Sequence, residues 1–339
     1  MRQVRLHGPQ DLRIDEVPMP VAGPGEVVVK VAMFGICGSD LGFARAGYIG
    51  RQSPQPMPLG HELVGTIHQL GSDVSGLYIG QRVVVHPMHG SNRIGTGDPV
   101  HGGFAEYLLV REAVIGKSLF EIPENMSFER AVLTEPLAVG MHGLNLGEAR
   151  ADDRVTVFGA GPIGLGVIAA LKHRGVQRIV AVDVIDSRLE RAQQLGAEQV
   201  INPTRDDLPT ALAEYFGKVR SSVTGQPLID CSLYIDCAGH ATLLQQTVAL
   251  ARDKARIVVL ATHKQPVELD MVQLMIKELS LLGSLSYPDE FPEVLLMLSD
   301  DKLSVAPLLS HQFTFEAFAD AFAAAQQAGD SAKVVVRLD

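Results

Sequence analysis

The chain has 339 residues and carries 29 basic against 39 acidic side chains, a formal net charge of −10. This acidic balance argues against a nucleic-acid partner, because polyanion binding needs a basic surface. No stretch of about 18 apolar residues is free of charge, which argues against a membrane span, and the first residues lack the apolar core of a secretory signal. We therefore expect a cytoplasmic protein with two domains, since its length exceeds the usual size of a single core.

The first part of the chain, to about residue 150, is predicted to consist mainly of strands. Short valine-rich runs are separated by glycine-rich loops, and no helical pattern comes between them; they lie at 26–34, 63–69, 81–86 and 104–110. Successive strands without intervening helices favour an antiparallel sheet or barrel.

After residue 153 the pattern changes to alternating strands and helices. Strands are predicted at 155–158, 178–183, 198–201, 231–237, 255–261 and 278–284. This alternation predicts a doubly wound parallel sheet with a ligand at the carboxyl ends of its strands. The polar segment 219–227 is expected to be a surface loop. A final helix at 315–328 and strand at 333–338 are expected to return to the first domain.

A glycine-rich turn directly follows the first strand of this second region: Gly159-Ala160-Gly161-Pro162-Ile163-Gly164. Gly159 permits a tight turn, Gly161 lets a pyrophosphate approach the backbone, and Gly164 lets the next helix pack against the sheet. Pro162 suits the first helical turn. The motif in this position predicts a dinucleotide site.

An acidic residue, Asp183, ends the second strand of this region. It is placed to accept a hydrogen bond from a ribose 2′-OH and to repel a 2′-phosphate, which favours NAD as the cofactor. Arg188 lies five residues further on. It is either a solvated charge on the next helix or a contact along the adenosine.

Three fragments of the first region contain residue types that bind metals: GICGSD at 35–40, GHE at 60–62 and TEPL at 134–137. A thiolate, an imidazole and a carboxylate suit zinc. However, these groups lie far apart in the sequence, so spacing alone does not distinguish a metal site from ordinary core and loop residues.

Taken together, GICGSD, GHE, EPL, the glycine-rich turn and its terminal acid resemble the zinc-dependent medium-chain alcohol dehydrogenases. Within them the chain is most similar to the branch of sorbitol, L-idonate, butanediol and threonine dehydrogenases. The resemblance implies an α/β fold: a mostly-β GroES-like catalytic domain from residues 1–150 and 286–339, and an NAD-binding Rossmann domain from 151–285, with the active site in the cleft between them. It also implies a homodimer or homotetramer, in which the strand at 278–284 could pair with its copy.

The resemblance implies roles for particular residues. Cys37 and His61 match zinc ligands. Glu62 and Glu135 match two acids that bind the metal directly or through its water, and the sequence leaves open which one ligates; Glu62 could instead form a salt bridge behind the site. Ser39 matches the hydroxyl that passes the substrate proton toward solvent, and it could also cap the following helix.

The nicotinamide end of the cofactor is implied to meet the last strands of the Rossmann domain. Backbone near Leu260, Ala261 and Thr262, and near Ser284 and Leu285, matches the segments that line it in relatives. Lys333 matches a basic residue close to the C-terminal strand of relatives, and we interpret it as a solvated lysine.

The implied chemistry is oxidation of a secondary alcohol through a zinc-bound alkoxide and hydride transfer to NAD. The expected substrate is a polyol or sugar derivative, similar to sorbitol or L-idonate. A vicinal diol or threonine is the alternative, because Gly42 and Phe43 replace a histidine and a tyrosine common in polyol relatives, and 283–287 lacks their arginine. Two functions of other classes remain as alternatives: a zinc-free reductase and a non-catalytic NAD-binding protein.

Relatives hold a second, structural zinc with four cysteines in a lobe that corresponds to residues 86–102. This chain has no cysteine there, so we predict one catalytic zinc and no structural one. His86, His89 and His101 lie in or beside this lobe. We interpret them as solvated or hydrogen-bonded side chains, because loop histidines are more often these than metal ligands.

Overall fold

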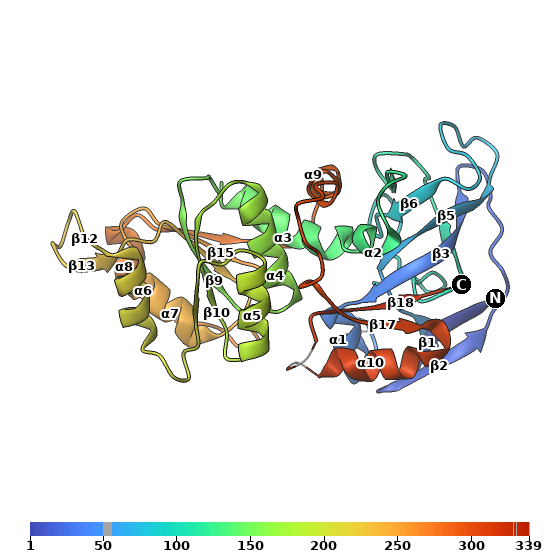
Figure 1. Cartoon of the computed structure of the whole chain (residues 1–339). Coiled ribbons are helices and arrows are strands. Elements are labelled where there is room, and N and C mark those ends of the chain that lie inside the picture. Colours follow the sequence, from blue (N-terminus) through green and yellow to red (C-terminus); the bar gives the residue numbers. More distant parts are fainter. Residues whose placement is uncertain (50–55, 328, 330, 339) are drawn as a thin grey trace. The chain divides into compact units, whose positions relative to one another are not determined.

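The computed structural model describes residues 1–49, 56–327, 329 and 331–338 (Figure 1). The chain divides into two compact units. Unit 1 comprises Met1–Glu135, Phe291–Asp301 and Leu309–Asp339, and unit 2 comprises Pro136–Glu290 and Lys302–Leu308. The C-terminal segment thus joins the first unit, while a short excursion at 302–308 belongs to the second.

The sequence places the first domain boundary at residue 150, whereas the structure places it between Glu135 and Pro136. The reason is helix α3 (Thr134–Leu146), which packs on unit 2. A Cβ at Gly140 would lie 3.0 Å from the Val167 side chain, and one at Gly143 would lie 2.8 Å from Leu260. These close approaches bind most of α3 to the second unit.

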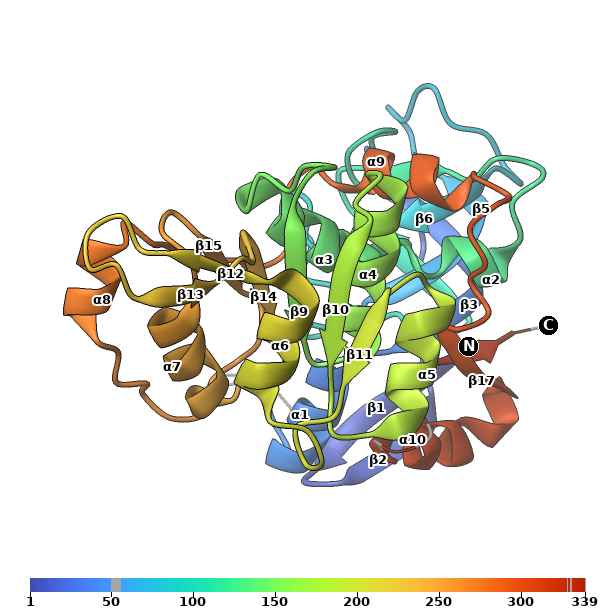
Figure 2. The same cartoon turned by 60° about the vertical axis from the view of Figure 1, so that its left-hand side comes forward.

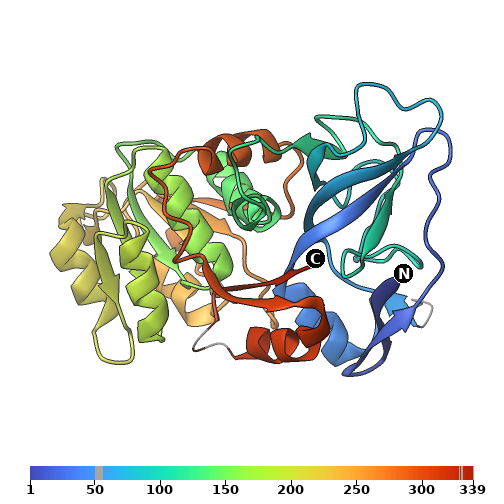
Figure 3. The same cartoon turned by 45° about the vertical axis from the view of Figure 1, so that its right-hand side comes forward.

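Unit 1 is built around a sheet with the strand order β17-β18-β3-β5-β6-β8, and β7 also pairs with β3. Its strands are antiparallel except that β17 runs parallel to β18. The C-terminal strand lies along β3, as Figure 3 shows. The bounds are Val27–Ile36 (β3), Glu62–Leu70 (β5), Arg82–Val85 (β6), Tyr107–Val110 (β7), Leu119–Glu121 (β8), Leu309–Thr314 (β17) and Lys333–Arg337 (β18). The strands predicted in this region are confirmed.

A second sheet of unit 1 has the order β2-β1-β4. The strands are β1 (Arg2–Gly8), β2 (Asp11–Glu16) and β4 (Met57–Pro58), and the helices of the unit are α1 (Gly38–Ala46), α2 (Phe128–Ala131), α9 (Phe291–Leu298), the 3₁₀ turn η1 (Phe315–Ala317) and α10 (Phe318–Gln326). Phe34, Phe104 and Phe318 pack ring against ring in the core. Residues from both chain ends therefore share one core.

Unit 2 is a parallel sheet in the order β11-β10-β9-β14-β15-β16 (Figure 2). The bounds are Arg154–Phe158 (β9), Arg178–Val182 (β10), Gln199–Ile201 (β11), Leu233–Asp236 (β14), Arg256–Val259 (β15) and Ser280–Gly283 (β16). The chain builds outward from β9 on one side and then from β14 on the other. The predicted doubly wound sheet is confirmed, and its order reverses between β9 and β14, where such folds bind ligands.

Helices cover both faces of the parallel sheet. Helices α6 (Leu208–Phe216) and α7 (Ala241–Leu250) share one apolar core with the sheet. Helix α4 (Pro162–His173) contacts α3 and α5 (Asp186–Gln194), and α8 (Met271–Ile276) follows β15. No helix among the described residues is long and apolar enough to cross a bilayer.

The segment 219–227, predicted to be a surface loop, is instead the end of a small hairpin. Strand β12 (Lys218–Arg220) pairs antiparallel with β13 (Pro227–Ile229). The backbone N–H of Ser221 donates to the carbonyl of Gln226 and closes the turn. Leu228 and Ile229 are buried, and this burial stabilises the hairpin. The polar residues at its tip are the reason why the sequence pattern predicted a loop.

Candidate active site

The candidate metal ligands of unit 1 come together where β3 ends and β5 begins. Gly35 of β3 is the register partner of Glu62 in β5, which sets Cys37 beside His61 and Glu62. One potential ligand atom from each of these three side chains lies within 4.8 Å of the others. Gly35 permits this approach, because a Cβ there would lie 2.1 Å from the Glu62 Oε2.

A buried carboxylate orients His61. Asp40 is fully buried and accepts hydrogen bonds from the backbone N–H groups of Cys37 (2.9 Å) and Gly60 (3.2 Å). Its Oδ1 lies 3.6 Å from the His61 Nδ1, while the His61 Nε2 lies 3.5 Å from the Ser39 Oγ. A carboxylate behind the imidazole is the arrangement that fixes a metal-binding histidine and its tautomer.

This arrangement fits a zinc ion. Because the His61 Nδ1 faces Asp40, the Nε2, on the side of Ser39, is the nitrogen left for a metal. Burial by itself lowers the pKa of His61, but the negative charges of Asp40 and Cys37 outweigh it and raise that pKa well above its usual value. A site that strongly attracts one positive charge, and that offers a thiolate, an imidazole and a carboxylate, has the donor chemistry of zinc.

Glu62 forms a buried ion pair with Lys333, the first residue of β18. The Lys333 Nζ lies 2.6 Å from one carboxylate oxygen and 2.8 Å from the other, and it donates to the Ile36 carbonyl at 3.3 Å. Lys333 is only 4% exposed, so the interpretation of it as a solvated lysine is wrong. Burial lowers the pKa of Lys333, yet Glu62 and Cys37 raise it overall. Direct ligation of a metal by Glu62 stays a prediction.

Glu135 and Ser39 flank this cluster in different ways. Glu135 is buried in the first turn of α3 and is not part of the close cluster, although its charge contributes to the raised pKa of Lys333. Its role as a ligand stays a prediction. Ser39 does not cap α1, because the capping position is Cys37 and the Asp40 side chain accepts its N–H.

Hydrogen bonds hold the lobe at residues 86–102. The buried Asn92 donates to the carbonyls of His89 (2.9 Å) and Arg111 (2.8 Å) and accepts from the Arg111 N–H. The buried Asp98 accepts from the backbone N–H groups of Val100 and His101 and from the Arg111 guanidinium at 2.7 Å. Together these contacts tie the lobe to Arg111, directly after β7.

The histidines of this lobe do not gather into a metal cluster. The ring centroids of His86 and His89 are 6.3 Å apart. Burial lowers the pKa of His101, which lies beside Asp98. Within the part of the chain that the structure describes, Cys37, His61 and Glu62 form the one group of three ligand-type residues spaced for a metal.

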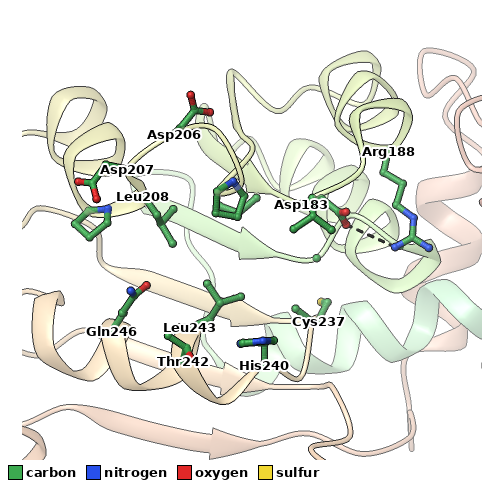
Figure 4. A pocket seen from close by; sticks show the side chains of 17 residues that line it. Asp183, Arg188, Asp206, Asp207, Leu208, Cys237, His240, Thr242, Leu243 and Gln246 are labelled. Atoms are coloured by element: carbon green, nitrogen blue, oxygen red, sulfur yellow. Dashed lines mark ion pairs between the residues drawn. The ribbon is translucent and has the colours of Figure 1, made fainter. Parts of the chain in front are cut away.

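A cavity of about 580 Å³ opens in unit 2 at the carboxyl ends of β9, β10 and β14 (Figure 4). The glycine-rich turn forms one wall, and helix α7 and the segment before α6 form the others. The lining residues are Gly159, Gly161, Val182, Asp183, Val184, Arg188, Pro203, Asp206, Asp207, Leu208, Pro209, Cys237, Ala238, His240, Thr242, Leu243 and Gln246.

The glycines of this turn have the predicted local geometry. Gly159 has a φ of +86°, which L side chains rarely adopt, and a Cβ at Gly164 would lie 1.8 Å from the Gly159 carbonyl oxygen. A Cβ at Gly161 would meet only Arg188, at 3.7 Å. Gly161 caps α4 and Pro162 begins it, so the open approach at Gly161 lies at a helix N-terminus, the kind of position that favours an anion.

Asp183 ties the glycine-rich turn to the end of β10. Its two carboxylate oxygens accept hydrogen bonds from the N–H groups of Ala160 (2.7 Å) and Ile185 (2.9 Å). The Arg188 Nη1 lies 3.7 Å from Asp183, and Figure 4 shows this pair facing the cavity. The Arg188 Nε is buried without a partner among the described residues. Arg188 is thus ion-paired with Asp183 and lies beside Gly161 rather than free in solvent, and its contact with the adenosine stays a prediction.

Other predicted cofactor contacts lie outside the lining of this cavity. Leu260, Ala261 and Thr262 follow β15, Ser284 and Leu285 follow β16, and Pro162 and Ile163 start α4. The Ser284 Oγ is buried without a partner among the described residues, whereas Leu285 is 88% exposed. Their contacts with cofactor stay predictions.

Sequence reasoning missed the part of the cavity wall that follows β11 and β14. Residues of 203–209 and of the first turns of α7 line it, including His240 and Gln246. Their position in the sequence could have indicated this, because they directly follow parallel strands, whose carboxyl ends lie at one edge of the sheet.

A mostly-β unit that gathers a thiol, an imidazole and a carboxylate, together with a doubly wound unit whose cavity adjoins a glycine-rich turn, defines a zinc-binding dehydrogenase. Family models agree: residues 23–124 match the alcohol dehydrogenase GroES-like domain, and residues 162–300 match the zinc-binding dehydrogenase domain.

Relatives match over nearly the whole chain. (R,R)-butanediol dehydrogenase of Bacillus subtilis is 31% identical, covering 99% of each chain, and human sorbitol dehydrogenase is 28% identical, covering 98% of this chain and 95% of its own. The solved structure of the alcohol dehydrogenase rspB from Escherichia coli CFT073, in complex with NADH, is 31% identical with a TM-score of 0.87 and covers 99% of both chains. The chain belongs to the polyol branch of the zinc-dependent medium-chain alcohol dehydrogenases, and it is an NAD-dependent alcohol dehydrogenase.

Proposed function

We propose that this dehydrogenase oxidises a secondary alcohol of a polyol or sugar-derived substrate to the ketone. The observation that carries the proposal is the close cluster of Cys37, His61 and Glu62 with the Ser39 hydroxyl beside it. The similarity to sorbitol and butanediol dehydrogenases supports a substrate with more than one hydroxyl group.

In this proposal Cys37 and His61 hold zinc, and either Glu62 or Glu135 completes the ligand set. Bound zinc supplies Lewis acidity toward a substrate oxygen, and bound NAD accepts the hydride. Asp40 keeps the imidazole of His61 in position from behind. The Lys333 side chain compensates the charge of Glu62, which otherwise would add to that of Cys37 and Glu135.

Ser39 is proposed to receive the proton of the substrate hydroxyl. Its Oγ lies 3.5 Å from the His61 Nε2, and the residue is exposed at the start of α1. A hydroxyl can accept one proton while it donates its own. An exposed serine beside the ligand cluster is therefore suited to pass a proton onward to water.

NAD, and not NADP, is the proposed cofactor. The Asp183 carboxylate lies at the cavity beside Arg188, and Asp206 and Asp207 belong to the segment before α6, which also lines it (Figure 4). These negative charges disfavour a 2′-phosphate, and Asp183 is accompanied by one positive charge, that of Arg188 at 3.7 Å.

A small vicinal diol is the alternative substrate, and threonine is a further one. Gly42 stands where polyol relatives carry a histidine, and a Cβ there would meet nothing within 4 Å. Phe43, unlike a tyrosine, has no hydroxyl to offer a sugar, and its ring packs against the apolar core. The ligand cluster argues against the zinc-free reductase and the non-catalytic NAD-binding protein.

We also propose that the protein binds a single, catalytic zinc. The contacts of Asn92, Asp98 and Arg111 support a lobe that folds without a second metal ion. A cytoplasmic homodimer or homotetramer is the proposed form of the protein. The outer position of β16 in its sheet supports assembly through that strand.

The test combines zinc analysis with a substrate panel. Protein purified without chelator is expected to contain about one zinc per chain and to reduce NAD with one of sorbitol, xylitol, L-idonate, butane-2,3-diol or threonine. Activity should disappear on chelation and return with zinc. Turnover of butane-2,3-diol alone would favour the diol alternative. NAD binding without zinc or turnover would contradict the proposal.

A further inference from the structure

We propose that Asp236 and His263 form a positioning pair for the second mononucleotide of bound NAD. The His263 Nε2 lies 2.7 Å from the Asp236 Oδ2, with side chains 14% and 3% exposed. The inference rests on the NAD-dependent activity proposed above and assigns a role to two residues that neither the glycine-rich turn nor the metal cluster includes.

The topology of unit 2 indicates where the second mononucleotide lies. A doubly wound sheet consists of two halves, and each half receives one mononucleotide at the carboxyl ends of its strands. The cavity with Asp183 belongs chiefly to the half that contains β9, β10 and β11. The other half contains β14, β15 and β16, and Asp236 is the last residue of β14.

Asp236 joins the two loops that leave this second half. Its Oδ1 accepts hydrogen bonds from the N–H groups of Ala238 (2.9 Å) and Gly239 (2.8 Å), in the loop after β14. Its backbone carbonyl accepts from Leu260 and Ala261, in the loop after β15. Asp236 thus fixes the first loop by its side chain and the start of the second loop by its backbone.

His263 extends this anchor to the rest of the second loop. Among the described residues, Thr262 and His263 donate no backbone hydrogen bond, so the imidazole is the polar contact that ties this stretch to the sheet. The fit is close, since a Cβ at Gly239 would lie 2.9 Å from the Thr262 carbonyl oxygen. At Thr262 and His263 the loop after β15 is therefore held by this one side-chain hydrogen bond, between the backbone contacts of Leu260 and Ala261 and the bond from Gln245 to the Glu268 carbonyl.

Loss of this bond should affect hydride transfer more than binding of the adenosine half. His263→Leu removes the donor to Asp236 and releases the loop at Thr262 and His263, while the residues that line the cavity with Asp183 and Arg188 keep their own side chains. Because small displacements at a reacting centre cost as much as 100-fold in rate, we expect kcat of His263→Leu to fall roughly 10- to 100-fold.

The experiment compares His263→Leu with His263→Gln, whose amide can still donate to Asp236. For each variant we would measure kcat and KM for NAD with the best alcohol of the panel, and the Kd of NADH and of AMP by calorimetry. We expect His263→Leu to lose kcat and NADH affinity with an AMP Kd within about twofold of wild type, and His263→Gln to recover most of the loss.

The matched control is His7→Leu, which removes a histidine–carboxylate pair of 2.8 Å with Asp15 on the surface of unit 1. It should leave all four constants unchanged. Unchanged kcat in His263→Leu, or equal losses of AMP and NADH affinity, would overturn the proposal. Wild-type protein that binds AMP but neither binds NADH nor oxidises any alcohol would overturn the proposed function and this inference with it.

Discussion

Lys333 and Glu62 are 271 residues apart in the sequence and form an ion pair that is closed to solvent, directly behind Cys37 and His61. The pairing of β18 with β3 brings the lysine there. Buried charges of this kind depend on each other, because a single one left without its partner is costly in a medium of low polarity. The C-terminal strand is therefore part of the support of the candidate metal site.

Lys333→Met should lower the free energy of unfolding by about 3–5 kcal/mol, because it leaves the Glu62 carboxylate buried without compensation. The measurement is urea denaturation followed by circular dichroism. The double variant Glu62→Gln/Lys333→Met removes both charges and should recover part of the loss. If Lys333→Met is as stable as wild type, the pair is not buried in solution.

Cys37→Ser should lose zinc and at least about 100-fold in kcat/KM, because Lewis acidity contributes several kcal/mol to such reactions. NADH binding should persist, since the cofactor cavity lies in unit 2. Metal analysis, turnover and NADH titration give the three readouts. Cys231→Ser is the control: it removes a buried thiol of unit 2 whose pKa burial raises to about 11. Turnover at the wild-type rate in Cys37→Ser would refute the metal-site assignment.

The lobe at 86–102 should loosen in acid. Burial by itself raises the pKa of Asp98, but hydrogen bonds from Val100, His101 and Arg111 outweigh it and lower this pKa below 3.8. A carboxyl whose pKa is lower in the folded state stabilises the protein above its unfolded pKa of about 3.9, and this contribution is lost as pH falls through the folded value.

Asp98→Asn should therefore weaken the lobe at neutral pH, by about 1–3 kcal/mol, and remove most of its own acid sensitivity below about pH 4. Hydrogen exchange in residues 86–102, measured from pH 7 to pH 3, tests both effects. Asp152→Asn, at an exposed carboxylate of unit 2, is the control. Protection that is the same in Asp98→Asn and wild type at every pH would contradict this account of the lobe.

The strands and the glycine-rich turn were predictable because their signals are local. The valine runs that became β3 and β9, and the φ of +86° at Gly159, follow from residue types at adjacent positions. Asp183 was found in the same way, since its distance from the turn reflects one strand-helix-strand unit.

The contacts that complete the sites were not predictable, because they join distant segments. Nothing near Lys333 in the sequence indicates that β18 turns it toward Glu62, so a lysine seemed better placed in water. Asn92 and Asp98 hold their lobe through hydrogen bonds to Arg111, and no spacing rule describes such contacts. The hairpin of β12 and β13 was hidden by the polar residues at its tip.

Asp183→Ser should shift cofactor preference toward NADP. The change removes the charge that repels a 2′-phosphate, and it also removes acceptors for the N–H groups of Ala160 and Ile185. We expect kcat/KM for NAD to fall roughly 10- to 100-fold, because hydrogen bonds to a charged group contribute about 1.5–3 kcal/mol, with a smaller fall for NADP. The ratio of the two kcat/KM values is the measurement. An unchanged ratio would mean that Asp183 does not face the ribose.

Leu281→Arg should convert the proposed oligomer into single chains. Strand β16 is an outer strand of its sheet, and apolar side chains around it are exposed: Met271, Val272, Met275, Leu281 and Leu285. An open strand edge with apolar neighbours is suited to pair with a second copy, and a charge at that edge opposes pairing.

Ile14→Arg is the matched control, because Ile14 is 42% exposed on β2, an outer strand of a sheet in unit 1. Sedimentation at micromolar concentration should give an oligomer for wild type and Ile14→Arg and a single chain for Leu281→Arg. If Ile14→Arg dissociates and Leu281→Arg does not, the interface lies on unit 1, and a monomeric wild type would rule out assembly through either edge.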